Sequence, residues 1–165
     1  MIIYYTRSNK TKVFAEALQD ILDMPLHELK SDLNDMGNLK FIIKAIGMVF
    51  SGKGHPVTNM PENVPEEIYL CGPIWGGRLV GPPRYFLNNA DLSKTKVNLL
   101  LTASTPVEKY KKQAWESLTQ INCVPGNAYI FATDSKNMPE RDVIVQQLTE
   151  ILQDDSLSEQ EALDK

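Results

Sequence analysis

Cysteine and histidine, which build most thiol, disulfide and zinc sites, are scarce in this chain. Its 165 residues include two cysteines, Cys71 and Cys123, and two histidines, His27 and His55. Neither pair has the short spacing of a CxxC redox motif or of a set of metal ligands. We therefore expect no disulfide framework and no metal site, and we expect a cytoplasmic protein.

Long apolar runs and an excess of basic residues are also missing. No stretch approaches the ~20 apolar residues of a membrane span, and the N-terminus lacks the basic and apolar regions of a signal peptide. The 17 lysines and arginines stand against 21 aspartates and glutamates, for a net charge of −4. Nucleic-acid binding needs a concentrated basic surface, so this charge argues against a nucleic-acid partner. It is compatible with docking onto basic partner proteins.

What the sequence does contain is an alternation of apolar runs with helix-like segments. Apolar runs typical of strands covered on both faces occupy residues 1–5, 68–75, 97–103 and 128–133, and a weaker, edge-like run occupies 25–30. Helical periodicity occupies 13–22, 105–121 and the residues after Pro139, and Thr105-Pro106-Val107-Glu108 has the pattern of a capping box. This order predicts one α/β domain with an open, doubly wound sheet of five parallel strands.

Two segments depart from the alternation. Residues 36–52 form an apolar helical insertion, with the sequence LKFIIKAIGMVF at 39–50. We interpret it first as a helix packed deeply against the sheet, and the alternative is a surface covered by a partner or by a second copy of the chain. Beyond the domain at 1–153, residues 154–165 form an acidic tail, which we expect to fray or to form a short surface helix.

A polar loop between the first strand and the first helix is the strongest candidate binding site. Ligands of parallel sheets bind at the carboxyl ends of the strands, where this loop lies. Its hydroxyls, its backbone N–H groups and the adjoining helix N-terminus favour an anion such as phosphate. Capping of the helix by one or two hydroxyls is the alternative. The loop consists of Thr6, Arg7, Ser8, Asn9, Lys10 and Thr11, and Asn9 tolerates the left-handed conformation that a tight loop needs.

This loop is neither GxxxxGK[ST] nor GxGxxG. It resembles the flavodoxin phosphate loop, [ST]-x-[ST]-G-x-T, with Thr6, Ser8 and Thr11 at the hydroxyl positions and Asn9 at the glycine position. EEIYLCGPIWGGRLVGPPRYFL is similar to the region around the third strand of flavodoxin-like proteins, and VNLLLTAST to their fourth strand and its loop. The resemblance covers residues 1–152 and implies the strand order 2-1-3-4-5, with FMN as cofactor.

The resemblance implies that two further loops contact the flavin. The loop that flanks the isoalloxazine ring comprises Pro73, Ile74, Trp75, Gly76, Gly77 and Arg78, and the loop on its pyrimidine side comprises Ala103, Ser104 and Thr105. Trp75 would either stack on the ring or end its strand in the core, and the two glycines would let a peptide change orientation. Arg78 would raise the reduction potential, meet a partner or face solvent. Tyr110 is the aromatic residue nearest to the third loop, and a core role is equally open.

A flavodoxin-like protein of this kind would be an FMN-binding electron carrier between a reductase and an acceptor enzyme, without catalytic residues of its own. Two alternatives stay open. One is an NAD(P)H-dependent flavin or quinone oxidoreductase, a kind of enzyme whose site often lies at a homodimer interface. The other is an interaction module that has lost its flavin, for which Asn9 at the glycine position and the third loop without an aromatic residue are arguments.

Overall fold

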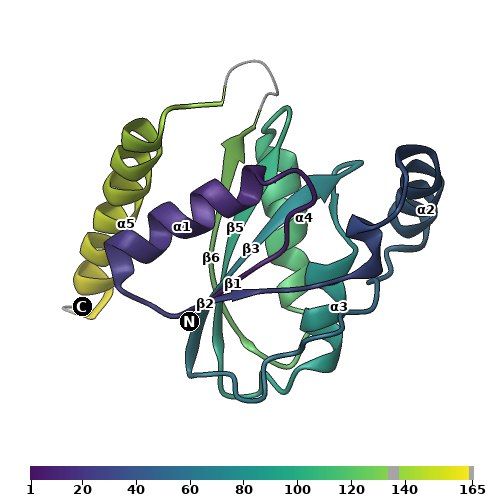
Figure 1. Ribbon diagram of the computed structural model, residues 1–165. Coiled ribbons are helices and arrows are strands. Elements are labelled where there is room, and N and C mark those ends of the chain that lie inside the picture. The colour runs from purple at the N-terminus through teal and green to yellow at the C-terminus, as the bar shows by residue number, and fades with distance from the viewer. Residues whose placement is uncertain (134–137, 164–165) are drawn as a thin grey trace.

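A sheet of five parallel strands forms the centre of the molecule (Figure 1). The computed structural model describes residues 1–133 and 138–163, with the side chains of the last helix described up to residue 155. The sheet has the order β2-β1-β3-β5-β6, so the predicted fold and strand order are confirmed. Its strands are β1 (Ile2–Tyr4), β2 (Leu26–Glu28), β3 (Glu67–Trp75), β5 (Lys96–Ala103) and β6 (Val124–Ala132). A further two-residue strand, β4 (Arg78–Leu79), pairs antiparallel with the end of β3.

Helices cover both faces of the sheet (Figure 1). On one face α1 (Lys10–Leu22) and α5 (Arg141–Leu163) build a core with Phe14, Leu18 and Ile144, and on the other α3 (Pro82–Asn89) and α4 (Glu108–Leu118) build a second core. Ile2 belongs to the first core and Ile3 to the second, which explains why the strands show little polar alternation. Within the described residues, no helix is long and apolar enough to cross a bilayer.

Two helices begin later than the sequence predicted. The prediction of a capping box at Thr105–Glu108 is wrong, because α4 begins only at Glu108. Its N-cap residue is Val107, which is extended, with φ −126° and ψ 128°, and makes no side-chain cap. The β-branched side chain of Val107 favours this extended conformation, so the helix starts only after it. Val107 is consequently exposed. The last helix, α5, begins at Arg141, two residues beyond Pro139.

The acidic tail continues the last helix. The backbone of α5 is helical as far as Leu163, and residues 164–165 lie outside the described residues. Ile144 and Leu148 of this helix are buried against the sheet.

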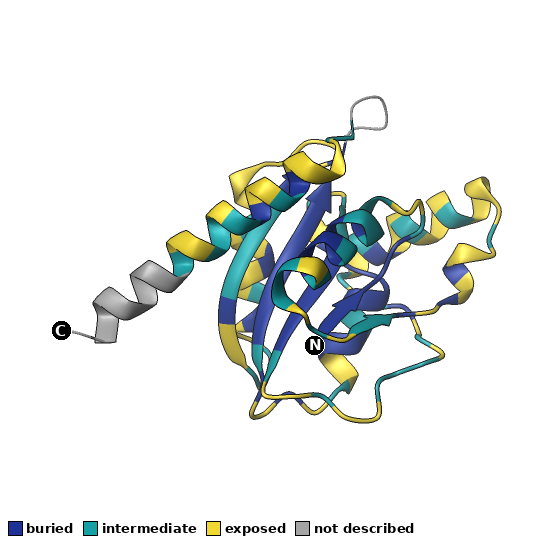
Figure 2. Ribbon diagram, turned by 60° about the vertical axis from the view of Figure 1, so that its left-hand side comes forward, coloured by how far each residue is buried: buried dark blue, intermediate teal, exposed yellow. Residues whose placement is uncertain are grey.

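The apolar insertion does not pack deeply against the sheet, so our first interpretation of it is wrong. It forms a short 3₁₀ helix, η1 (Asp32–Asn34), and α2 (Asn38–Ser51), which lies at the periphery of the molecule (Figure 1). Met48 is the only residue of α2 that is buried. The helix is apolar on two sides. One side packs against the cluster around Leu33, Val80 and Trp75, and the other stays exposed. Figure 2 shows exposed residues along the outer side of this helix.

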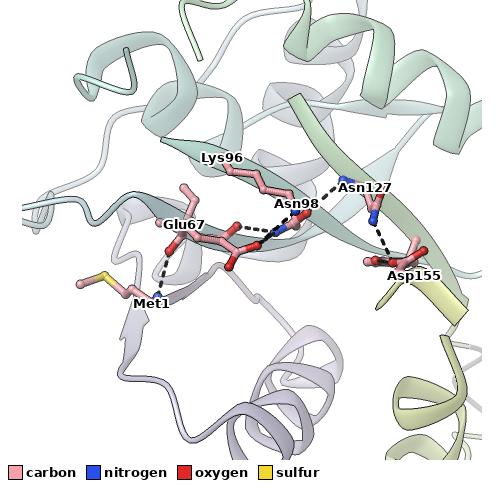
Figure 3. Close-up of polar contacts among 8 residues, drawn as sticks. Met1, Glu67, Lys96, Asn98, Asn127 and Asp155 are labelled. Carbon is pink, nitrogen blue, oxygen red and sulfur yellow. Dashed lines mark hydrogen bonds and ion pairs between the residues drawn. The ribbon is translucent and has the colours of Figure 1, made fainter. Parts of the chain in front are cut away.

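A chain of polar contacts joins the strands at their amino ends (Figure 3). Asn98, in the interior of the sheet, is 2% exposed. Its side-chain Nδ2 donates to Glu67 Oε1 at 2.9 Å, and its Oδ1 accepts from the backbone N–H of Asn127 at 3.0 Å. Asn127 Nδ2 in turn donates to Asp155 on α5. These bonds satisfy polar groups where the register between β5 and β6 shifts after Val97.

Substitution of Gly126 tests how tightly the side chain of Asn98 is held between β5 and β6. A Cβ atom at Gly126 would lie 2.3 Å from Asn98 Oδ1 and 3.0 Å from the carbonyl oxygen of Val97. Moving Asn98 Oδ1 would break its hydrogen bond from the backbone N–H of Asn127, and the carbonyl of Val97 is fixed in the backbone of β5. Gly126→Ala is therefore expected to lower the free energy of unfolding by about 2 kcal/mol in urea denaturation. Gly47→Ala, in the middle of α2 with open space around its Cβ, is the control, expected to raise stability by about 0.5–1 kcal/mol. Equal stabilities for the two variants would contradict this account of Asn98.

Candidate functional site

The loops that follow β1, β3 and β5 meet in one hollow of about 130 Å³ at the carboxyl ends of the strands. It is lined by Thr6, Arg7, Ser8, Lys10, Thr11, Pro73, Ile74, Trp75, Thr102, Ala103, Ser104 and Thr133. Most of the predicted site residues are thus brought together. Asn9, Gly76, Gly77, Arg78 and Thr105 lie in the same loops but do not line the hollow.

Sequence reasoning missed Thr102 and Thr133. Thr11 Oγ1 and Thr102 Oγ1 are 2.8 Å apart and share a hydrogen bond, which ties the start of α1 to β5. Thr133 directly follows β6, and its carbonyl oxygen accepts from Lys10 Nζ at 2.7 Å. Both threonines lie at the carboxyl end of a strand, and polar residues at that position were the signal that would have found them.

The N-terminus of α1 is open toward the hollow. Asn9 adopts the left-handed conformation, with φ 60° and ψ −1°, as its side chain allows. The N-cap residue Asn9 makes no capping hydrogen bond through its side chain, so within the described residues the alternative that the loop only caps the helix has no support. The first backbone N–H groups of α1 and the positive end of its dipole therefore remain available to an anion.

Two cationic side chains flank the hollow. Arg7 donates from Nη2 to the carbonyl oxygen of Met36 and to Asn38 Oδ1, both at 3.0 Å, and its Cζ lies 4.1 Å from the centre of the Phe41 ring. Its Nε is buried and has no hydrogen-bond partner among the described residues. Lys10 supplies the second positive charge. Among the described residues that line the hollow none is acidic, so its electrostatic environment favours a negatively charged group.

The Gly76–Gly77 turn closes the hairpin between β3 and β4. Trp75 pairs with Arg78 across it, and both glycines have positive φ angles, 54° and 79°, as two-residue hairpin turns require. The turn is held between two helices, because a Cβ atom at Gly76 would meet Val49 at 2.7 Å and one at Gly77 would meet Tyr110 at 2.8 Å. Tyr110 thus packs on the turn and does not line the hollow.

Arg78 is exposed and holds the end of α2. Its Nη1 donates to the carbonyl oxygen of Val49 at 3.1 Å, one of the carbonyl groups left free at the C-terminus of the helix. This contact fixes α2 to the hairpin and turns the guanidinium away from the hollow. Besides the roles predicted from the sequence (raising the reduction potential, meeting a partner or facing solvent), Arg78 therefore has a structural role.

The sequence left open whether Trp75 faces the ligand site or ends its strand in the core, and its half-buried side chain does both. It lines the hollow and also packs in a small apolar cluster. The rings of Tyr5 and Phe41 meet it nearly perpendicularly, with centroids at 6.1 Å and 5.1 Å. Tyr5 donates to Asn34 Oδ1 at 2.7 Å, and burial raises the pKa of its phenol, which keeps it neutral. These contacts hold the indole in one orientation.

The side chains of Cys71, His27 and His55 do not line the hollow. Burial raises the pKa of the Cys71 thiol, so it stays protonated within the sheet. His55 pairs with Asp32, and His27 bonds to the carbonyl oxygen of Asn59. In the part of the chain that the structure describes, no group of three or more histidine, cysteine or acidic side chains is arranged to hold a metal ion.

Three solved structures are similar to this chain over most of its length. A "putative flavoprotein" from Bacteroides uniformis is 17% identical, with a TM-score of 0.66, and the alignment covers 90% of this chain and 96% of that protein. One from Bacteroides eggerthii is 15% identical, with a TM-score of 0.64 and coverages of 92% and 96%. A flavoprotein from Lactobacillus acidophilus, in complex with FMN, is 21% identical, with a TM-score of 0.62 and coverages of 82% and 93%.

No protein-family model and no curated protein matches the sequence. The three structural likenesses confirm, at the level of the fold, the resemblance to flavodoxin-like proteins that the sequence predicted.

Proposed function

We propose that this protein binds FMN, with the phosphate in the loop between β1 and α1, and carries electrons between redox partners. The observation that carries the proposal is the meeting of the three loops around one hollow beside the uncapped start of α1. The Lactobacillus acidophilus structure, in complex with FMN, supports the choice of ligand.

The residues around the hollow fit a phosphate group. The backbone N–H groups at the start of α1, the hydroxyls of Thr6 and Ser8 and the unpartnered Nε of Arg7 are donors, and Lys10 adds positive charge. The hollow, at about 130 Å³, is smaller than the ~300–1,000 Å³ of most ligand pockets. It therefore suits the anionic end of a ligand, and the flavin ring would extend out of it along the loops at 73–78 and 103–105, whose first residues line the hollow.

A carrier suits this site better than a hydrolase or a transferase. Among the described residues that line the hollow, none is a histidine, cysteine or carboxylate that could act as acid, base or nucleophile. Bound FMN would supply the redox chemistry, and this chain would supply anchoring and orientation. We further propose a reductase and an acceptor enzyme as partners. A reducing compartment, the cytoplasm, agrees with Cys71 and Cys123 being unpaired.

An NAD(P)H-dependent oxidoreductase is the second candidate, because α2 borders the site through Phe41 and could help to cover it.

Two assays on the purified protein test the proposal. Added FMN is expected to bind with submicromolar affinity, seen as a change in flavin fluorescence. The loaded protein alone is expected to leave NAD(P)H unoxidised. With a flavodoxin reductase and a one-electron acceptor added, it is expected to carry electrons from NAD(P)H to that acceptor. Steady NAD(P)H oxidation by the loaded protein alone would establish the second candidate instead. Absence of FMN binding would leave only an interaction module on this fold.

A further inference from the structure

The outer face of α2 is apolar and uncovered. Its bulky side chains recur every three or four residues and therefore form one continuous stripe along the helix. We call this the outer stripe, and its members are between 51% and 84% exposed (Figure 2). The outer stripe consists of Leu39, Ile42, Ile43, Ile46 and Phe50.

The outer stripe cannot turn inward, because the opposite side of α2 is already packed. Phe41, Met48 and Val49 contact the cluster around Trp75 and Val80. Both ends of the helix are also tied down. Arg7 bonds to Asn38 at the beginning, and Arg78 bonds to the carbonyl oxygen of Val49 near the end. The outer stripe is thus presented in a fixed geometry, which lowers the entropy cost of covering it.

The area of the outer stripe matches what a dimer needs. With roughly 150 Å² for each fully exposed side chain of this size, the stripe offers on the order of 500 Å² of apolar surface. The largest apolar patch on a typical monomer is ~300–600 Å², so this patch lies at the upper end of that range. Two such stripes facing each other would bury about 1,000 Å² before any neighbouring residue is counted, which reaches the lower limit for a specific interface.

The charges at the two ends of the helix suit an antiparallel pair. Asp35 precedes α2 and is exposed, Lys53 follows it and is exposed, and Lys40, also exposed, adds a positive charge near the start of the helix. In an antiparallel pair Asp35 of each copy lies toward Lys53 of the other, and the two helix dipoles oppose each other. Lys44, beside the stripe, already compensates Asp32 of its own chain, whose pKa is lowered mainly by its hydrogen bond with His55 and in part by this lysine.

We propose that two copies of this chain form a twofold-symmetric dimer in which the outer stripes of the two α2 helices pack antiparallel. A second copy is the occupant that the area of the stripe and the pairing of Asp35 with Lys53 favour, because a twofold interface brings the same patch of each copy together. Full overlap of the stripes places Leu39 of one copy beside Phe50 of the other and Ile43 near the symmetry axis. The dimer is independent of flavin binding.

Sedimentation velocity over a range of protein concentrations tests the proposal, with Ile43→Glu as the disrupting variant. The wild-type protein is expected to be dimeric at micromolar concentration. Ile43→Glu, which would place two carboxylates in the apolar interface, is expected to weaken the dimer by about tenfold or more. Val143→Glu is the matched control, because Val143 on α5 is an exposed apolar residue outside the outer stripe, and it should leave the dimer unchanged.

A monomeric wild-type protein, or a dimer that Ile43→Glu leaves intact, would overturn the proposal. So would wild-type protein that stays monomeric and sediments with phosphatidylglycerol vesicles through this stripe, since the occupant would then be a membrane surface. Oxidative cross-linking in a Cys123→Ser background checks the orientation. A mixture of Leu39→Cys and Phe50→Cys proteins should cross-link, whereas cross-linking of each variant with itself would contradict the antiparallel arrangement.

Discussion

Gly77→Ala is expected to lower the free energy of unfolding by about 3 kcal/mol, through left-handed backbone strain and a clash with Tyr110. Gly77 has φ 79°, a conformation that an alanine adopts only at a cost. The added Cβ would also lie 2.8 Å from Cε1 of Tyr110, and the tyrosine ring cannot retreat without leaving its place against the turn. Guanidinium denaturation monitored by circular dichroism measures the change.

Gly52→Ala separates the two causes. Gly52 also has a positive φ, 67°, but its Cβ would meet Arg78 Nη1 at an ordinary 3.7 Å. This control is expected to lose about 1 kcal/mol from backbone strain alone. The excess loss in Gly77→Ala then measures the contact with Tyr110. If Gly77→Ala and Gly52→Ala lower the free energy of unfolding by the same amount, Tyr110 does not pack tightly against the turn.

Arg7→Ala is expected to weaken FMN binding by about 10- to 100-fold, because it removes a charge-assisted donor from the proposed phosphate site. Arg7 lines the hollow, and its buried Nε lacks a partner among the described residues. The same substitution removes the hydrogen bonds to Met36 and Asn38, so it should also lower the free energy of unfolding by about 1–3 kcal/mol. Flavin fluorescence titration and urea denaturation measure the two effects.

Lys12→Ala is the matched control for Arg7→Ala. Lys12 lies in the first turn of α1, a few residues after Arg7, and carries the same charge, but its side chain is 41% exposed, pairs with Glu16 and does not line the hollow. Its removal should leave FMN affinity nearly unchanged, because an exposed charge is screened by solvent. Arg7→Lys keeps the charge and loses the planar donor group, so it should restore part of the affinity. Equal effects of Arg7→Ala and Lys12→Ala would mean that only net charge matters.

Much of the fold was predictable because each buried strand leaves a local signal. The apolar runs at 1–5, 68–75, 97–103 and 128–133 overlap β1, β3, β5 and β6, since strands covered on both faces need apolar residues throughout. The loop geometry at Asn9 was predictable for a similar reason, because few residues tolerate a left-handed backbone. Thr102 and Thr133 escaped notice because a single threonine at a strand end has several common roles.

The insertion was misjudged because periodicity does not say which stripe of a helix finds a partner. The residues at 39–50 are apolar on most sides, and both a buried helix and a surface helix with a covered outer face have that pattern. The choice between them depends on how much surface the rest of the chain offers, which here is the small cluster around Leu33, Val80 and Trp75. The start of α4 was misjudged because local preferences at Thr105–Glu108 compete, and Val107 stays extended.

The comparison of FMN with riboflavin tests the central claim most directly, since the two ligands differ only in the phosphate. Both dissociation constants would be measured by fluorescence titration of the wild-type protein in a buffer without phosphate. If the loop between β1 and α1 holds the phosphate, FMN binds at least about 100-fold more tightly than riboflavin, and added inorganic phosphate weakens FMN binding. Equal affinities for the two ligands, or no binding of either, would contradict the assignment of Thr6–Thr11 as a phosphate site.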